Sequence, residues 1–195
     1  TLWMLIGVGG GLIAALNKGR WPDRTIVGSA LIGFSLPTFF VGLVLLTFPA
    51  IKWGWVPIPN FVPFFENPWE WARNLILPWI TLAFFFAASY VRLTRAYMIE
   101  TMSEDYIRTA RAKGLPERTV VVRHAFRNSL IPITTIVAAD VGGLIGGAII
   151  TERIFAFSGM GALFNSGLQA GDPNPVMAYF IVIAIFAITF NFLAD

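Results

Sequence analysis

The sequence contains no cysteine and only one histidine among its 195 residues. Without cysteine, the chain cannot form a disulfide, a thiolate metal site or a thiol nucleophile. One histidine cannot form the histidine clusters that bind metal ions. We therefore expect no metal site and no catalytic site built from these residue types.

Charged residues are also scarce, at 13% of the sequence, whereas soluble domains carry about 25%. Hydrophobic residues make up 56%, aromatic residues make up 15%, and the mean hydropathy is +0.71. The net charge is only +3, which gives no indication of nucleic-acid binding. This composition is typical of an integral membrane protein surrounded by lipid.

Apolar stretches of roughly the length that crosses a bilayer recur along the chain. A helix needs about 20 apolar residues to cross the bilayer core, and its backbone polar groups must bond to one another there. We therefore expect an all-α, multi-pass membrane protein with five transmembrane helices in this chain. The predicted spans are 1–17, 26–50, 74–91, 129–150 and 175–194.

The basic residues are divided unevenly between the segments that connect these spans. Eleven of the fourteen lie in 18–24 and 92–127, and only Lys52, Arg73 and Arg153 lie elsewhere. Because basic loops stay on the cytoplasmic side, we place 92–127 in the cytoplasm and loops 51–73 and 151–174 outside. This orientation puts Thr1 outside, so we expect a six-span parent protein with one further span before Thr1.

One acidic residue lies near the middle of a predicted span. A charged aspartate there costs about 2.5–3.5 kcal/mol on insertion, so Asp140 should face a polar group, and it either bonds to another helix or lines a transport pathway. The glycines that follow it are spaced for close helix packing or for lining a passage. The candidate pathway residues are therefore Asp140, Gly142 and Gly146.

Glycine and proline also mark the first two spans. The run "GVGGGL" at 7–12 has no Gly-Lys-Ser/Thr after it, which excludes a nucleotide-binding loop. We expect these glycines to permit close packing between helices. Pro37 lies inside its span and should kink that helix, either as part of a gate or as a plain structural bend.

The basic segment 92–127 has the signals of two short helices joined by a turn. The span 74–91 should continue as helix to about residue 101, and a second helix should follow over 104–114. Ser103 is placed to cap this second helix, Glu104 to pair with Arg108, and Gly114 to end it. Pro116 should open a helix over roughly 116–130 that leads into the next span.

The helix over 104–114 has two open interpretations. Tyr106, Ile107 and Ala110, flanked by Arg108 and Arg111, form a surface that can dock into a groove on a soluble partner. Alternatively, the basic residues only set the orientation in the membrane and contact lipid headgroups.

The stretch "DYIRTARAKGLPERTVVVRHAFRNSLIP" resembles the cytoplasmic loop of ABC-transporter permeases, and in particular the dipeptide/oligopeptide permease family. The match includes 105–114, His124, Asn128 and Pro132. The generic importer loop has Glu-Ala-Ala, three residues and then Gly, whereas this chain has Arg108 at the Glu position. "WPDR" at 21–24, "SLPTFFVGLVLL" at 35–46, "GGAIITERIFAFSGMGALF" at 146–164 and "NFLAD" at 191–195 also resemble that family. The third of these stretches fits the pattern Glu-x-Ile/Val-Phe-x3-Gly-x-Gly.

The resemblance implies a type I ABC importer permease fold, with 1–195 forming one transmembrane permease domain. It implies a subunit that forms half of the pathway of an ATP-driven peptide importer in the bacterial inner membrane. The expected partners are a second homologous permease, two cytoplasmic ATPase subunits and an external substrate-binding protein. The chain has no Gly-x4-Gly-Lys-Ser/Thr motif, so ATP and Mg should bind the ATPase subunits, and this chain should be neither an enzyme nor a cofactor-binding subunit.

The resemblance also assigns roles within the loop. It makes 104–114 the coupling helix that docks on the ATPase, through Glu104, Asp105, Tyr106, Ile107, Arg108, Ala110, Arg111, Lys113 and Gly114. Pro116, His124 and Asn128 would brace the loop, His124 by hydrogen bonding. The cargo stays open, because similar permeases carry nickel chelates or glutathione. An ion-coupled transporter would need more charge within the membrane than Asp140 provides, and no constellation for an intramembrane enzyme is present.

Overall fold

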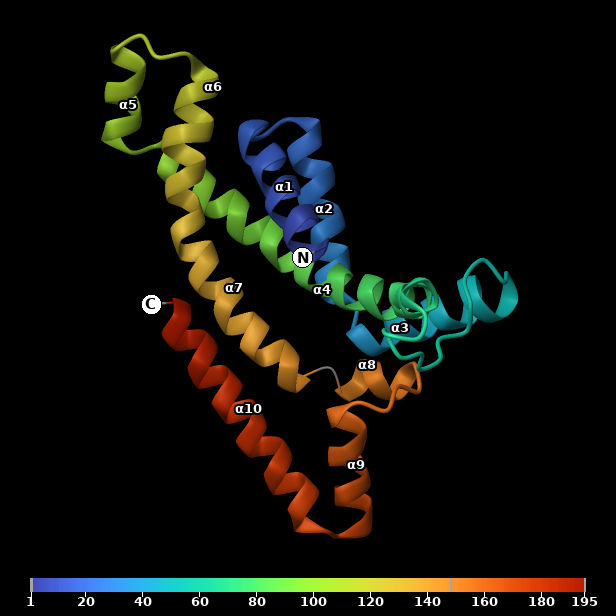
Figure 1. Cartoon of the computed structure of the whole chain (residues 1–195). Coiled ribbons are helices and arrows are strands. Elements are labelled where there is room, and N and C mark those ends of the chain that lie inside the picture. Colours follow the sequence, from blue (N-terminus) through green and yellow to red (C-terminus); the bar gives the residue numbers. More distant parts are fainter. Residues whose placement is uncertain (1, 148, 195) are drawn as a thin grey trace. The chain divides into compact units, whose positions relative to one another are not determined.

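The computed structural model describes residues 2–147 and 149–194, and all the regular elements of this part are helices. The predicted all-α class is therefore confirmed. The chain folds into two compact units, which are described separately below (Figure 1). Unit 1 comprises residues 1–35 and 83–136, and unit 2 comprises residues 36–82 and 137–195. The helices α4 (Pro68–Met102) and α7 (Arg127–Gly147), between which most of the loop 92–127 lies, each have one part in unit 1 and the other in unit 2.

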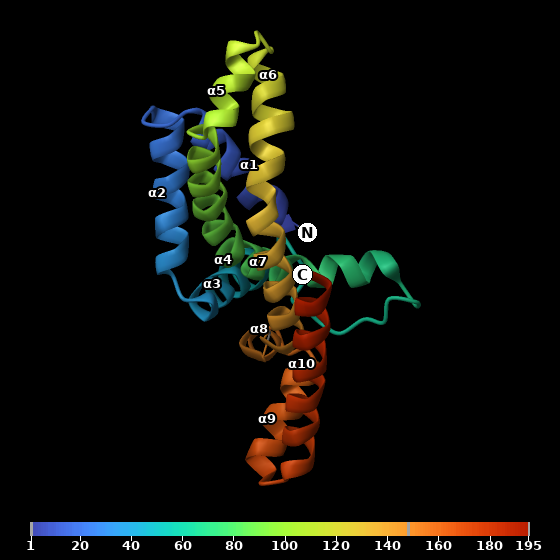
Figure 2. The ribbon, with the colours of Figure 1, turned by 90° about the vertical axis from the view of Figure 1, so that its left-hand side faces the viewer.

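Unit 1 contains the first two helices and the loop 92–127. Its elements are α1 (Leu2–Leu16), α2 (Trp21–Ser35), the second part of α4 (Pro68–Met102), α5 (Asp105–Ala112), α6 (Glu117–Thr119), the π-helix η2 (Val120–Phe126) and the first part of α7 (Arg127–Gly147). α1 packs against α2, and the two run side by side (Figures 1 and 2). All eleven basic residues that we predicted to be cytoplasmic belong to this unit.

Glycines allow α1 to approach α4 closely inside unit 1. A Cβ added at Gly7 would lie 2.5 Å from the Cβ of Tyr90, and one at Gly11 would lie 2.5 Å from the Cβ of Thr94. Side chains do not tolerate such distances, so the helices can meet in this way only through glycine. The predicted packing role is confirmed for these two positions, whereas a Cβ at Gly9 would meet nothing within 4 Å.

A buried ion pair joins α2 to α4 in the same unit. Arg95 donates from Nε and Nη2 to the two carboxylate oxygens of Asp23, at 2.5 and 2.8 Å, and Asp23 is only 4% exposed. The same carboxylate accepts the backbone N–H of Gly19 at 2.8 Å. Asp23 therefore fixes the turn between α1 and α2 onto α4, which gives the "WPDR" stretch a structural role.

Unit 2 contains the segments that we predicted to be external. Its elements are α3 (Thr38–Leu45), the π-helix η1 (Leu46–Lys52), the first part of α4, the last part of α7, α8 (Ile149–Ile154), α9 (Met160–Ala170) and α10 (Pro173–Ala194). A core of Ala50, Leu77 and Phe155 joins η1, α4 and the end of α8. α9 and α10 form a hairpin, and Gly171 at its tip has a φ of +67° (Figure 1).

The predicted spans are confirmed in part. Among the described residues, α4 and residues 173–193 of α10 are long and apolar enough to cross a membrane, and α2 with α3–η1 adds a third if this broken pair is one span. The break lies at 36–37, where Pro37 is extended at φ −60° and ψ 140°, so the expected kink is an interruption of the helix. The predicted span 1–17 forms the shorter α1, and 129–150 corresponds to α7.

The two segments predicted to be external contain helices. α4 already begins at Pro68, so the irregular part of loop 51–73 covers only the residues between η1 and α4. Loop 151–174 is mostly helical, because α8 and α9 occupy most of it. The predicted continuation of α4 to about residue 101 is correct, since α4 ends at Met102.

Candidate functional site

The candidate site is the segment 103–128, called here the loop hairpin, which lies at one end of unit 1 (Figure 2). Gly114 adopts a φ of +75° and reverses the chain after α5, as predicted. Pro116 is the N-cap of α6, and α6, η2 and α7 follow one another without interruption. The predicted cap by Ser103 is wrong, because its hydroxyl donates to the carbonyl oxygen of Glu100 at 2.6 Å and closes the end of α4 instead.

One face of α5 is buried within unit 1. Ile107 is fully buried and Ala110 is 7% exposed, and both belong to a core with Met98, Val120 and Ala125. This corrects the prediction that these two side chains are presented to a partner. They hold α5 against α4 and η2, because apolar side chains gain free energy when they leave water.

The opposite face of α5 is exposed and polar. Its exposed residues include Glu104, Asp105, Tyr106, Arg108, Thr109, Arg111, Lys113 and Gly114. The expected Glu104–Arg108 pair does not form, since Arg108 Nη1 lies 3.3 Å from Asp105 Oδ1 instead. Both side chains of this pair are more than 70% exposed, so it contributes little to stability. Most of the predicted coupling residues are thus available at the surface.

An ion pair closes the turn between α5 and α6. Arg111 donates from Nη2 and Nε to the two carboxylate oxygens of Glu117, at 2.6 and 3.1 Å. These hydrogen bonds lower the pKa of the Glu117 carboxyl and raise the pKa of the Arg111 guanidinium. This pair was not predicted from the sequence, because the two residues are six positions apart across a turn. The sequence signal for this pair is the opposite charge of Arg111 and Glu117, which lie before and after "KGLP".

A second polar contact joins α5 to the start of α7. The side-chain amide of Asn128 donates to the hydroxyl of Tyr106 at 2.9 Å. Asn128, one of the predicted bracing residues, therefore has a defined partner. His124 lies half-buried on η2, and its ring makes none of the hydrogen bonds found among the described residues.

A π-helix occupies the centre of the loop hairpin. Seven residues, Val120–Phe126, are π-helical where the sequence predicts regular helix over 116–130. Val120 and Ala125 on this segment are both fully buried. π-helical turns are rare and are frequent at functional sites, and this one lies where α5 is attached to the helix that becomes α7.

The candidate pathway residues lie on α7, in its part within unit 2. Asp140 is half-buried there. Gly142 and Gly146 fall within the helix, but their surroundings are outside the part of the chain that the structure describes. The role of these three residues stays a prediction.

The Glu-x-Ile/Val-Phe-x3-Gly-x-Gly pattern has a structural basis in unit 2. Glu152 accepts the backbone N–H groups of Gly161 and Ala162 at 2.9 and 3.2 Å, so its carboxylate caps the positive end of α9. A Cβ at Gly159 would overlap this carboxylate, which explains the first glycine. Phe155 is 2% exposed in the core of the unit. The pattern therefore encodes one compact turn between α8 and α9.

Known transport proteins match this chain over nearly its whole length. Residues 7–195 match the family model described as binding-protein-dependent transport system inner membrane component. A peptide transport system permease of Brucella abortus (strain 2308) is 36% identical over 190 residues, covering 97% of this chain and 60% of the relative. The glutathione transport system permease of Escherichia coli (strain K12) is 35% identical over 204 residues, covering all of this chain and 64% of the relative.

The chain thus spans less than two thirds of the length of these relatives. The family match, in contrast, covers nearly all of this chain and includes both the loop hairpin and the turn between α8 and α9. The chain belongs to the family of binding-protein-dependent transport system inner membrane components.

Proposed function

We propose that this chain is a permease subunit that forms half of the translocation pathway of an ATP-driven importer for peptides. Membership of the family supports the role in transport. The Brucella relatives, which are described as peptide transport permeases at 36% identity, support the class of cargo. The proposed location is the bacterial inner membrane, which the family description names.

The observation that carries this proposal is the construction of the loop hairpin. The inner face of α5 is packed on Met98 and Val120, and its outer face is polar and exposed. The Arg111–Glu117 ion pair and the Tyr106–Asn128 hydrogen bond fasten it at two further points. A loop that only set the membrane orientation would not need these contacts, whereas a loop that transmits force needs them all.

The proposed mechanism follows from these attachments. When ATP draws two ATPase subunits together, the groove that holds α5 moves, and α5 moves with it as a packed element. Its buried face transmits this displacement to the end of α4, and Tyr106 transmits it to Asn128 at the start of α7. Both long helices reach from the loop hairpin into the membrane, so their movement opens the pathway, and hydrolysis of ATP reverses it.

The proposed partners are two cytoplasmic ATPase subunits, a second homologous permease and an external substrate-binding protein. The family description names dependence on a binding protein. This chain has no Gly-x4-Gly-Lys-Ser/Thr motif, so ATP and Mg would bind the ATPase subunits, and this chain would supply passage and coupling without catalysis.

A second candidate cargo is glutathione, because the Escherichia coli relative is a glutathione transport permease. Nickel chelates are a third cargo that the sequence leaves open, but neither relative described above is named for them. An ion-coupled carrier is the least supported alternative, because it leaves the polar outer face of α5 without a role.

The test is to purify the permease with its associated subunits and reconstitute the complex into vesicles. We expect two ATPases, a second permease and a binding protein to co-purify, and peptide uptake to require ATP. Arg108→Glu reverses a charge on the exposed face of α5 and should lower ATPase binding, whereas Arg73→Glu in unit 2 should leave it unchanged. Ion transport by the purified chain alone would refute the proposal.

A further inference from the structure

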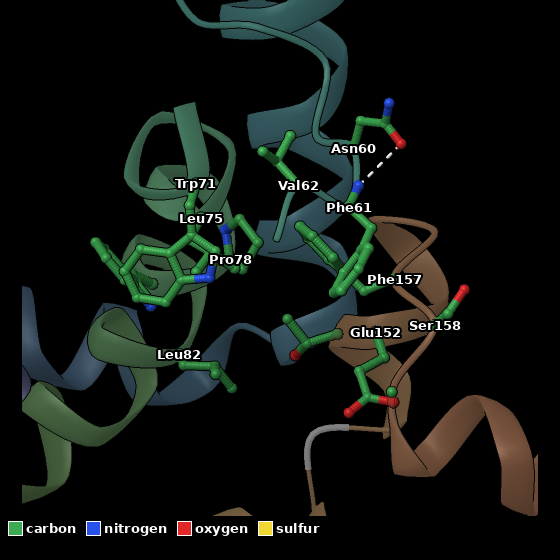
Figure 3. Close-up of a pocket in the computed structure, with 13 residues that line it drawn as sticks. Asn60, Phe61, Val62, Trp71, Leu75, Pro78, Leu82, Glu152, Phe157 and Ser158 are labelled. Atoms are coloured by element: carbon green, nitrogen blue, oxygen red, sulfur yellow. Dashed lines mark hydrogen bonds between the residues drawn. The ribbon is translucent and has the colours of Figure 1, made fainter. Parts of the chain in front are cut away.

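Unit 2 contains a cavity of about 290 Å³ that the proposed mechanism does not use (Figure 3). Its walls come from the segment before α4, from α4 itself, and from α8 with the turn that follows it. The lining residues are Asn60, Phe61, Val62, Trp71, Leu75, Pro78, Trp79, Leu82, Thr151, Glu152, Phe157, Ser158 and Gly159. The loops that contribute to it are those predicted to be external.

The cavity is predominantly apolar and aromatic. Four aromatic residues belong to its lining: Phe61, Trp71, Trp79 and Phe157. The rings of Trp71 and Trp79 pack edge to face, with 5.5 Å between their centroids. An apolar cavity of roughly 150 Å³ is already large enough to bind benzene. A cavity of about 290 Å³ therefore has room for a large aliphatic or aromatic group.

Polar contacts hold the walls in place. The side-chain oxygen of Asn74 accepts the backbone N–H of Asn60 at 2.9 Å, and the amide of Asn74 donates to the carbonyl of Glu70 at 2.8 Å. Asn60 in turn accepts the N–H of Phe61 at 2.9 Å, as Figure 3 shows. The irregular segment is thereby tied to α4, so the cavity is preformed, as ligand sites usually are.

The charge of the cavity disfavours an anionic ligand. Glu152 alone among the lining residues is ionisable, and its carboxylate is held by the N–H groups of Gly161 and Ala162. A carboxylate of glutathione would be repelled there, and glutathione has no large apolar side chain to fill the space. The uncharged polar residues of the lining are Asn60, Thr151 and Ser158.

We propose that this cavity receives an apolar side chain of the transported peptide on the external side of the membrane. The inference rests on the proposed function and deepens it, because it selects peptides with large apolar side chains over glutathione. The family and the peptide transport permeases among its relatives favour a peptide over the acyl chain of a lipid as the occupant.

The experiment compares ATP-dependent uptake of Ala-Phe-Ala and Ala-Ala-Ala by the reconstituted complex. Leu82→Trp should fill the cavity and lower the ratio of Phe-peptide to Ala-peptide uptake by about 10-fold, the size expected for an apolar pocket that loses its fit. Trp71→Ala enlarges the cavity and should also lower the ratio, by removing the aromatic contact. Phe65→Ala, on a side chain that is 95% exposed outside the lining, is the control and should leave the ratio unchanged.

The possible outcomes distinguish failure of the cavity inference from failure of the proposed peptide import. An unchanged ratio in both cavity variants would overturn this inference while leaving peptide import intact. An equal fall in the uptake of both peptides would also overturn it, because the cavity would then not distinguish a phenylalanine from an alanine side chain. If the unmodified complex hydrolyses ATP but imports neither peptide, the proposed function itself fails, and this inference fails with it.

Discussion

Single glycines decide how closely helices approach in this protein. Gly7 and Gly11 face α4 at distances that exclude any Cβ, and Gly159 leaves room for the carboxylate of Glu152. Gly9 is on the same helix as Gly11 but faces no neighbour within 4 Å. The composition of the run "GVGGGL" does not distinguish these positions, because the distinction depends on which helix face meets α4.

This difference predicts opposite effects of two equivalent substitutions. Gly11→Ala should destabilise the protein by about 1–3 kcal/mol, because its Cβ would lie 2.5 Å from that of Thr94 and the helices would have to separate. Gly9→Ala should be neutral or stabilising by up to about 1 kcal/mol, because alanine favours helix. Thermal unfolding of both variants in the same detergent measures the effect. Equal shifts for the two would refute the assigned packing of α1.

At the scale of elements, α5 is a short helix held by contacts at both of its ends. The ion pair between Arg111 and Glu117 holds its C-terminal end, and Tyr106 holds its N-terminal end to Asn128. Between them, Ile107 and Ala110 fill the core of unit 1. An eight-residue helix is too short to be stable alone, so these contacts determine whether α5 is folded.

The ion pair predicts a dependence of the hairpin on pH. The hydrogen bond with Arg111 lowers the pKa of the Glu117 carboxyl in the folded state. The ion pair therefore stabilises the folded state fully at pH values above the ordinary glutamate pKa of about 4.3. The effect is lost as the pH falls through the lowered pKa. Glu117→Gln should remove it at neutral pH and speed hydrogen exchange in α5 relative to the unmodified protein.

The control is hydrogen exchange in α5 of the unmodified protein and of the Glu117→Gln variant, measured at acid pH. Once Glu117 is protonated, the unmodified protein and the Gln variant should exchange at similar rates after correction for the intrinsic effect of pH. If Glu117→Gln leaves exchange in α5 unchanged at neutral pH, the ion pair does not hold the turn.

The Tyr106–Asn128 contact predicts a specific loss of coupling. Tyr106→Phe and Asn128→Ala both remove the same hydrogen bond. Each should lower transport per ATP hydrolysed, and the double variant should be no worse than the more impaired single variant. Thr25→Ala, on an exposed side chain of α2 outside the loop hairpin, is the comparison and should leave this ratio unchanged. Strictly additive losses would show that the two residues act independently.

Local signals predicted much of the loop hairpin correctly. Gly114 ends α5, Pro116 precedes the next helix, and α4 continues to Met102, close to the predicted residue 101. The burial of Ile107 and Ala110 was missed, because an eight-residue amphipathic helix can turn its apolar face toward its own protein or toward a partner. The complete break before Pro37 was expected only as a kink, because proline permits both outcomes.

At the scale of the whole molecule, the division of charge coincides with the division into units. Unit 1 holds eleven of the fourteen basic residues, and unit 2 holds three. The loop hairpin belongs to unit 1, whereas the aromatic segment between η1 and α4 and the cavity belong to unit 2. Because basic segments remain in the cytoplasm, segment 92–127 should lie in the cytoplasm and segment 51–73 outside.

The absence of cysteine makes this orientation directly measurable. Lys113→Cys places a thiol on the exposed loop hairpin, and Phe65→Cys places one on a side chain that is 95% exposed in unit 2. A membrane-impermeant maleimide added to spheroplasts should label the Phe65→Cys variant but not the Lys113→Cys variant, and in inverted vesicles the preference should reverse. The unmodified chain has no thiol to react and sets the background. Labelling of both variants from the same side would contradict the positive-inside assignment, and with it the placement of the cavity outside and of the coupling surface in the cytoplasm.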